Sequence, residues 1–256
     1  MTLTTPILPV QPPEFIKLLA NEVRWGVLQA LANGDLQVNE LVNQLQQPMN
    51  LVSYHLKKMR DEALVTTRRS EADGRDVYYS LDLTRLRRLF LESGQALHPA
   101  IGLPLATFDP MRLRPQRILF ICTHNSARSQ MAEGLLRHLS RERLTVSSAG
   151  SQPTAVHPDA IRTLAQLGID MRRQHSRSTD AFISQPFDYV ITVCDKAREV
   201  CPTFPGAGQR LHWGFPDPVA IAADDARAAA FTLTAQRLKS RIEYFLTTLP
   251  TAESER

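Results

Sequence analysis

The stretch Ile118-Leu-Phe-Ile-Cys122-Thr-His-Asn125-Ser-Ala-Arg128-Ser129-Gln-Met-Ala-Glu133 decides the fold of the second half of this chain. Its apolar start is typical of a buried strand, and its last residues begin a helix. The loop between them begins with a cysteine and holds an arginine six positions later. Backbone N–H groups of such a loop can surround a tetrahedral oxyanion, while the helix N-terminus adds its dipole and Arg128 a two-pronged donor. The stretch therefore predicts an oxyanion-binding loop.

The same positive field predicts an active thiol at Cys122. Helix N-termini lower the pKa of a cysteine from about 8.5 to roughly 3.5–7.5, so we expect a nucleophilic thiolate at neutral pH. An inert cysteine at the end of a buried strand is the alternative. Asn125 is expected to brace the loop, and Ser129 to hydrogen-bond the thiolate. The predicted oxyanion-binding residues are Thr123, His124, Asn125, Ser126, Ala127, Arg128 and Ser129.

Strands and helices alternate through the rest of the second half. This alternation predicts an α/β fold in which a parallel sheet carries helices on both faces, with ligands bound beyond the carboxyl ends of its strands. The expected strands are 117–121, 145–148 and 188–193, and the expected helices are 129–140, 158–167 and 225–249.

The first half follows a different pattern, in which helices precede a short hairpin marked by Asp73-Gly74. This order predicts a winged helix-turn-helix domain. Its expected helices are 15–31, 36–45, 49–63 and 84–97, and its expected strands are 64–69 and 77–81. Residues 99–115 contain four prolines and read as a linker. We predict a DNA-binding domain at 14–98, this linker, and a catalytic domain at 116–250.

The overall composition limits the class of protein. With 43% hydrophobic residues and no long apolar run, the chain shows neither a membrane span nor a secretory signal, which predicts a cytoplasmic location. The net charge of +4 is mild, but basic residues cluster at 57–75 and 85–88, as in proteins that bind nucleic acid. A solvated basic face is the alternative. Three cysteines without an export signal favour thiol chemistry over structural disulfides, and we predict no bound metal or cofactor.

The segment from Cys122 to Glu133 resembles the anion-binding loop of the low-molecular-weight protein tyrosine phosphatases, and it is more similar to their arsenate reductase branch. The resemblance covers Arg117 to Leu249. It implies that Asp217, in an Asp-Pro step, is the general acid, although such a step is also a common turn. Some relatives bind a structural monovalent cation beside the loop. Arg177 stands where an aspartate ligand is expected, which leaves this cation in question.

The resemblance and the chemistry together imply a relay of three cysteines. Reduction of arsenate needs two electrons more than phosphate hydrolysis, and thiols can supply them by forming a disulfide. Cys122 is the expected nucleophile, Cys194 then forms a disulfide with it, and Cys201 moves the disulfide outward to Cys194–Cys201. An external thiol donor, thioredoxin above all, is the expected reductant. Two cysteines without a role, or a two-thiol metal clip, are the alternatives.

The segment Ser53–Val65 with the basic hairpin after it resembles the dimeric arsenic-repressor family of winged-helix regulators, over residues 14–97. The resemblance implies a homodimer that binds a double-stranded DNA operator. The predicted DNA-binding residues are Asn50, Ser53, Tyr54, Lys57, Lys58, Arg68, Arg69 and Arg75. Residues 35–42 lack cysteine, so this domain cannot bind arsenite through thiolates of its own. Two alternatives stay open: a phosphotyrosine phosphatase with the same fusion, and a repressor that uses the catalytic domain as a sensor.

Overall fold

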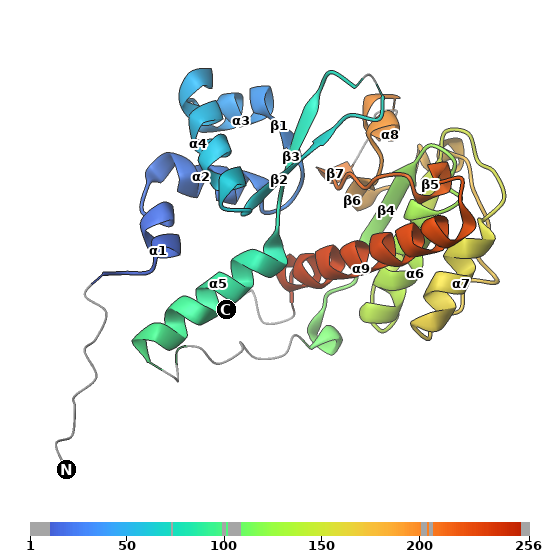
Figure 1. Cartoon of the computed structure of the whole chain (residues 1–256). Coiled ribbons are helices and arrows are strands. Elements are labelled where there is room, and N and C mark those ends of the chain that lie inside the picture. Colours follow the sequence, from blue (N-terminus) through green and yellow to red (C-terminus); the bar gives the residue numbers. More distant parts are fainter. Residues whose placement is uncertain are drawn as a thin grey trace, which may run out of the picture.

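Two hydrophobic cores organise the protein. Figure 1 shows the helices and strands that surround them. A computed structural model describes residues 11–72, 74–98, 101, 109–200, 204 and 207–251 of the chain. The first core is built from side chains between Phe15 and Leu81, and the second from side chains between Leu113 and Leu249. Most of the predicted linker lies outside the described residues, so the domain boundaries stay a prediction.

The first half begins with two helices where the sequence predicts one. Helix α1 spans Glu14–Leu19 and helix α2 spans Glu22–Leu31. The break falls at Asn21, whose side chain accepts a hydrogen bond from the backbone N–H of Arg24 at 3.1 Å and caps α2. The apolar residues of both helices follow a single helical spacing. The sequence pattern therefore does not show that a new helix begins after Asn21.

The remaining elements of the first half form a helix-turn-helix and a wing. A short strand β1 (Leu36–Gln37) precedes α3 (Val38–Leu45), where Glu40 closes a capping box with Gln37. The antiparallel strands β2 (Val65–Arg69) and β3 (Val77–Leu81) form the wing, and their sheet has the order β1-β3-β2. Helix α4 (Met49–Asp61) lies before the wing and helix α5 (Leu83–Leu97) after it.

The second half is a parallel sheet with helices packed on it, which confirms the predicted fold class. The strand order is β5-β4-β6-β7, and every neighbouring pair is parallel. The strands are β4 (Arg117–Cys122), β5 (Thr145–Gly150), β6 (Phe187–Thr192) and β7 (Ala207–His212). The helices are α6 (Arg128–Leu139), α7 (Pro158–Gln166), α8 (Asp195–Val200) and α9 (Asp224–Thr248). Single 3₁₀ turns lie at Pro110–Arg112, Thr179–Phe182 and Pro218–Ala220.

Sequence reasoning missed β7 and α8. The edge strand β7 has the sequence Ala-Gly-Gln-Arg-Leu-His, with no apolar run, and residues 208–210 are exposed. Helix α8 has only six residues, too few for a helical period to be read. Both elements matter for the site, because α8 directly follows Cys194 and β7 leads into the loop that carries Asp217.

The two halves contact each other at the turn after α2. Asp35 donates its backbone N–H to the carbonyl of His212 at 2.8 Å, and its carboxylate accepts from the Gly214 amide at 2.8 Å. The indole of Trp213 donates to the carbonyl of Asn33 at 2.9 Å. In Figure 1 the hairpin of β2 and β3 ends beside α8. The wing is therefore turned toward the catalytic half, an orientation that the sequence does not predict.

Candidate active site

The loop predicted to bind an oxyanion joins the end of β4 to the start of α6. The carbonyls of Thr123, His124 and Ser126 accept hydrogen bonds from the amides of residues 152, 154 and 157, at 2.9, 3.0 and 2.9 Å. These carbonyls therefore point outward, toward the segment after β5. Because each peptide unit is planar and trans, the N–H groups of residues 124, 125 and 127 point the opposite way, toward the centre of the loop. This arrangement suits an anion.

Gly150 allows the loop to lie directly on β5. A Cβ atom at this position would sit 2.6 Å from the carbonyl oxygen of Thr123 and 2.8 Å from the amide nitrogen of Asn125. Both are backbone atoms of the loop, so they could not move without distorting it. Asn125 itself has a φ of 47°, a left-handed conformation that asparagine tolerates better than most residues. The loop shape thus depends on both residue types.

Asn125 braces the loop from inside and is fully buried. Its Nδ2 donates to the hydroxyls of Ser129 at 2.9 Å and Ser148 at 2.8 Å. Its Oδ1 accepts from the side chain of Gln130 at 3.1 Å and from the backbone N–H of Arg177 at 2.8 Å. These four hydrogen bonds fix the Asn125 side chain, and they therefore also hold the loop backbone at this residue.

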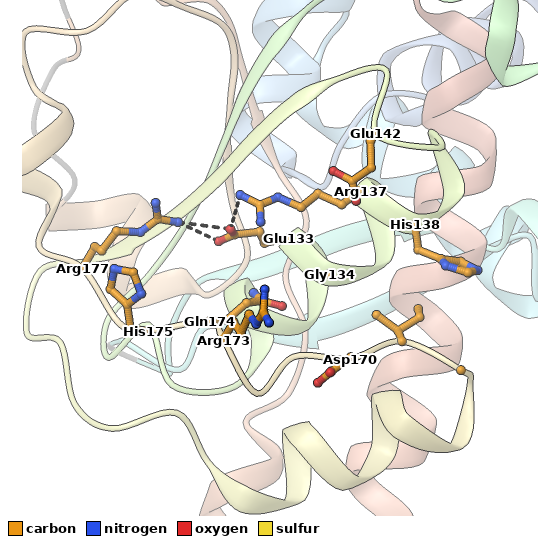
Figure 2. Close-up of a pocket in the computed structure, with 12 residues that line it drawn as sticks. Glu133, Gly134, Arg137, His138, Glu142, Asp170, Arg173, Gln174, His175 and Arg177 are labelled. Atoms are coloured by element: carbon orange, nitrogen blue, oxygen red, sulfur yellow. Dashed lines mark hydrogen bonds and ion pairs between the residues drawn. The ribbon is translucent and has the colours of Figure 1, made fainter.

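Arg177 supplies a positive charge beside the loop, and sequence reasoning did not anticipate this role. Its Nη2 lies 2.9 and 3.1 Å from the carboxylate oxygens of Glu133, which also accept from Ser148 at 2.6 Å. Arg137 approaches the same carboxylate at 2.8 Å. Figure 2 shows Glu133 between the two guanidinium groups. The sequence did offer one signal for this role, because Arg177 stands at a position where an aspartate was expected.

The nucleophile candidate, Cys122, is 4% exposed at the bottom of the loop. Its sulfur lies 2.9 Å from the Ser129 hydroxyl and 3.1 Å from the Asn125 amide. Burial raises the pKa of the Cys122 thiol, and nearby Cys194 adds to the rise; Ser129 and Arg128 act in the opposite direction without outweighing them. The expectation of a lowered pKa is therefore wrong for this conformation.

The surroundings of Arg128 explain why its positive charge does not outweigh the effect of burial on the pKa of Cys122. The residue is 6% exposed, and its guanidinium faces two carboxylates, Asp217 at 3.1 Å and Glu71 of the wing at 2.9 Å. It also donates to the carbonyl of Phe215 at 2.8 Å. Two negative partners offset the charge that would otherwise favour a thiolate at Cys122. Asp217, the predicted acid, thus lies beside Arg128, whereas Glu71 is a contact that the sequence did not predict.

Cys194 contacts Thr123, the residue that follows the candidate nucleophile in the chain. Its sulfur is 3.4 Å from the Thr123 hydroxyl and 3.4 Å from the backbone nitrogen of Ala197 in α8. Cys122 and Cys194 are both free thiols and both buried. Cys201 lies outside the described residues. The structure therefore brings two of the three relay cysteines to one loop.

Five predicted DNA-binding residues share the exposed face of α4, opposite its buried side chains. They are Asn50, Ser53, Tyr54, Lys57 and Lys58. Arg69 and Arg75 are exposed on the wing. Arg68 is different, because its guanidinium forms ion pairs with Asp195 and Asp35. The prediction that Arg68 reaches DNA phosphates therefore does not hold in this conformation, where the side chain faces the catalytic half.

Within the described part of the chain, no three His, Cys, Asp or Glu side chains gather closely enough to hold a metal ion. None of the helices described is both long and apolar enough to cross a membrane.

Comparison with known families gives two matches. Residues 117–254 match the family described as low molecular weight phosphotyrosine protein phosphatase. Residues 21–67 match the family described as bacterial regulatory protein, arsR family. The two matches do not overlap, and each falls on one of the two hydrophobic cores.

Individual relatives are similar to the second half alone. An arsenate reductase of Halalkalibacterium halodurans is 39% identical over 132 residues, which are 51% of this chain and 95% of the relative. An arsenate reductase of Bacillus subtilis is 36% identical over the same shares. Among solved structures, an arsenate reductase in the phosphate binding state is 29% identical, with a TM-score of 0.47, over 53% of this chain and 99% of the other.

Proposed function

Because this chain belongs to the low molecular weight phosphotyrosine protein phosphatase family and its catalytic half is similar to arsenate reductases, we propose that it reduces arsenate to arsenite through Cys122, Cys194 and Cys201. One observation carries this proposal. Two buried free thiols flank Thr123 on the oxyanion-binding loop, whereas phosphate hydrolysis needs only one.

The first step is attack on the oxyanion. The Cys122 thiolate forms a bond to arsenic while an oxygen leaves as water. Asp217, beside Arg128, protonates that leaving oxygen. Arg128 and the inward N–H groups of the loop hold the remaining oxygens, where negative charge develops. The product is a covalent adduct of Cys122 in which arsenic is still pentavalent.

The second step is the reduction. The Cys194 thiolate attacks the sulfur of Cys122, the S–As bond breaks, and its electron pair leaves with arsenic as arsenite. Both sulfurs are oxidised to a Cys122–Cys194 disulfide as arsenic is reduced from the pentavalent to the trivalent state. Cys201 then attacks Cys194, which frees Cys122. A dithiol donor of the thioredoxin class reduces the Cys194–Cys201 disulfide, a reaction suited to the reducing cytoplasm.

The test is arsenate-dependent NADPH oxidation in the presence of thioredoxin and thioredoxin reductase. The parent is compared with Cys122→Ser, Cys194→Ser and Cys201→Ser, and all three variants should lose multiple-turnover activity. In a single turnover without a donor, Cys201→Ser should still release one arsenite per chain. Activity that persists in Cys201→Ser with glutathione would instead assign a small-thiol donor. Hydrolysis of p-nitrophenyl phosphate without arsenate reduction would identify a phosphatase.

The first half adds a regulatory role to this proposal. We infer that residues 14–98 bind double-stranded DNA as a homodimer, with the exposed face of α4 in the major groove. The match to the arsR family and the gathering of polar and basic side chains on α4 support this inference. Gel filtration combined with light scattering tests the dimer. A monomer at micromolar concentration would contradict it.

A further inference from the structure

The wing places a carboxylate at the oxyanion-binding arginine. Glu71, at the turn between β2 and β3, accepts from Arg128 Nη1 at 2.9 Å through one oxygen. Its other oxygen accepts from the backbone N–H of Asp217 at 2.8 Å. The Glu71 side chain is 27% exposed, so it bridges the two residues at the edge of the site. A carboxylate from the DNA-binding half thus binds two groups of the catalytic half.

One of these two donors, Arg128, is also proposed to hold the oxygens of the substrate. Arg128 faces Asp217 through Nη2 and Glu71 through Nη1, so both ends of its guanidinium already face a carboxylate. A tetrahedral dianion bound by the same guanidinium would bring further negative charge next to both carboxylates. Asp217 is required nearby as the proton donor. Glu71 is therefore the partner that an incoming oxyanion has to displace.

Residues around Glu71 also bind α8, the helix that follows Cys194. The backbone N–H of Glu71 donates to the Asp195 carboxylate at 2.8 Å, and Arg68 pairs with the same group. Ser70 donates to Glu199 at 3.2 Å. Asp195 and Glu199 both belong to α8, which lies between Cys194 and Cys201. The wing therefore contacts both the arginine of the oxyanion site and α8, the helix that lies between Cys194 and Cys201 in the sequence.

We propose that Glu71 is an internal substitute for the substrate, so that a tetrahedral oxyanion at the Cys122 loop releases the wing from the catalytic half. The effector belongs to the class of arsenate and phosphate. The proposal rests on the proposed function, because it assigns the regulatory ligand to the same loop. By thermodynamic linkage, wing docking weakens oxyanion binding by the same factor by which the oxyanion weakens docking.

The test compares Glu71→Gln with the parent and with Glu62→Gln. Glu62 is an exposed glutamate of the same half, so its variant carries the same change of charge away from the site. The probe is inorganic phosphate, which cannot be reduced, titrated by calorimetry at constant ionic strength. Glu71→Gln should bind phosphate on the order of tenfold more tightly than the parent, because a charged competitor is lost. Glu62→Gln should match the parent.

A second measurement on the parent protein follows the contact between the wing and α8. Hydrogen exchange of the Glu71 amide, which donates to Asp195, should accelerate when phosphate is added. A chloride addition of equal ionic strength should leave it unchanged. Arsenate without a thiol donor is tested in parallel. If both ions accelerate the exchange, the effector is the oxyanion class; an effect of arsenate without one of phosphate would contradict displacement of Glu71 by the tetrahedral oxyanion itself.

Three outcomes separate the proposals. Equal phosphate affinity in the three proteins, or unchanged exchange at Glu71, overturns the role of Glu71 while arsenate reduction by the parent can stand. Tighter binding by Glu71→Gln together with faster exchange supports it. Failure of all three proteins both to bind phosphate and to reduce arsenate overturns the proposed function, and this inference with it.

Discussion

The Ser129 hydroxyl lies 2.9 Å from the sulfur of Cys122, and Asn125 holds that hydroxyl from its other side. This hydrogen bond lowers the pKa of a thiol that burial raises. Removing the Ser129 hydroxyl therefore changes the reactivity of Cys122 with only a small change in side-chain volume.

Ser129→Ala should raise the pKa of Cys122 further, because the thiolate loses a hydrogen bond. A higher pKa leaves less thiolate at pH 7, so alkylation by iodoacetamide should slow by about tenfold. The rising limb of the rate against pH should move to higher pH. Ser184→Ala, at an exposed serine, is the control. An equal loss of rate at every pH would show that the hydroxyl does not act through ionisation.

Arg177→Ala should destabilise the fold by about 1–3 kcal/mol, since the buried carboxylate of Glu133 loses two hydrogen bonds to a charged partner. Urea unfolding measures this change. The control is Arg172→Ala, which breaks an exposed pair with Asp170 and should leave the stability nearly unchanged, because solvent screens such a pair. Equal losses in both variants would remove the structural role assigned to Arg177.

The contact between wing and catalytic half should weaken in acid through Asp195. Burial of this carboxylate favours the protonated form, but hydrogen bonds from His212, Arg68 and the Glu71 amide outweigh burial and hold its pKa at about 2, below the ordinary 3.8. A lowered pKa stabilises the fold above pH 3.8, and that stabilisation is lost as the pH falls through 3.8 toward 2.

The stabilisation amounts to about 2.5 kcal/mol, since the pKa of Asp195 falls from 3.8 to about 2 and one pKa unit corresponds to about 1.4 kcal/mol. The measurement is urea unfolding of the parent and Asp195→Asn between pH 7 and pH 2. The free energy of unfolding should differ between the two by a constant amount down to about pH 4, and the difference should shrink below it. A difference that stays constant to pH 2 would show that Asp195 does not titrate in this range.

Lys58→Ala should weaken DNA binding through the loss of one phosphate contact. Lys58 is exposed on α4, with its ammonium 5.1 Å from the ring centre of Tyr54. The slope of the logarithm of affinity against the logarithm of salt concentration should fall by about 1, measured by anisotropy on a mixed-sequence duplex. Lys239→Ala on α9 should leave the slope unchanged. If both variants behave alike, α4 is not the DNA-binding face.

Local patterns were enough to predict most elements, and the failures have identifiable causes. Strand β3 (Val77–Leu81) begins and ends where the alternation of its residues placed it. The single helix expected at 15–31 was wrong because Asn21 caps a new helix without breaking the apolar period. Strand β7 was missed because its residues carry no apolar run, and its partner β6 supplies the pairing instead.

The sequence by itself determined the order of strand, loop and helix around Cys122, because the three are continuous in the chain and follow from local residue preferences. Only the tertiary structure decided the state of that loop. The pKa of Cys122 depends on burial by the whole catalytic half, and Arg128 meets Glu71 across 57 positions of chain. Arg177 reaches Glu133 across 44 positions. Contacts of this kind arise from packing between distant segments, and no periodicity or spacing in the sequence encodes them.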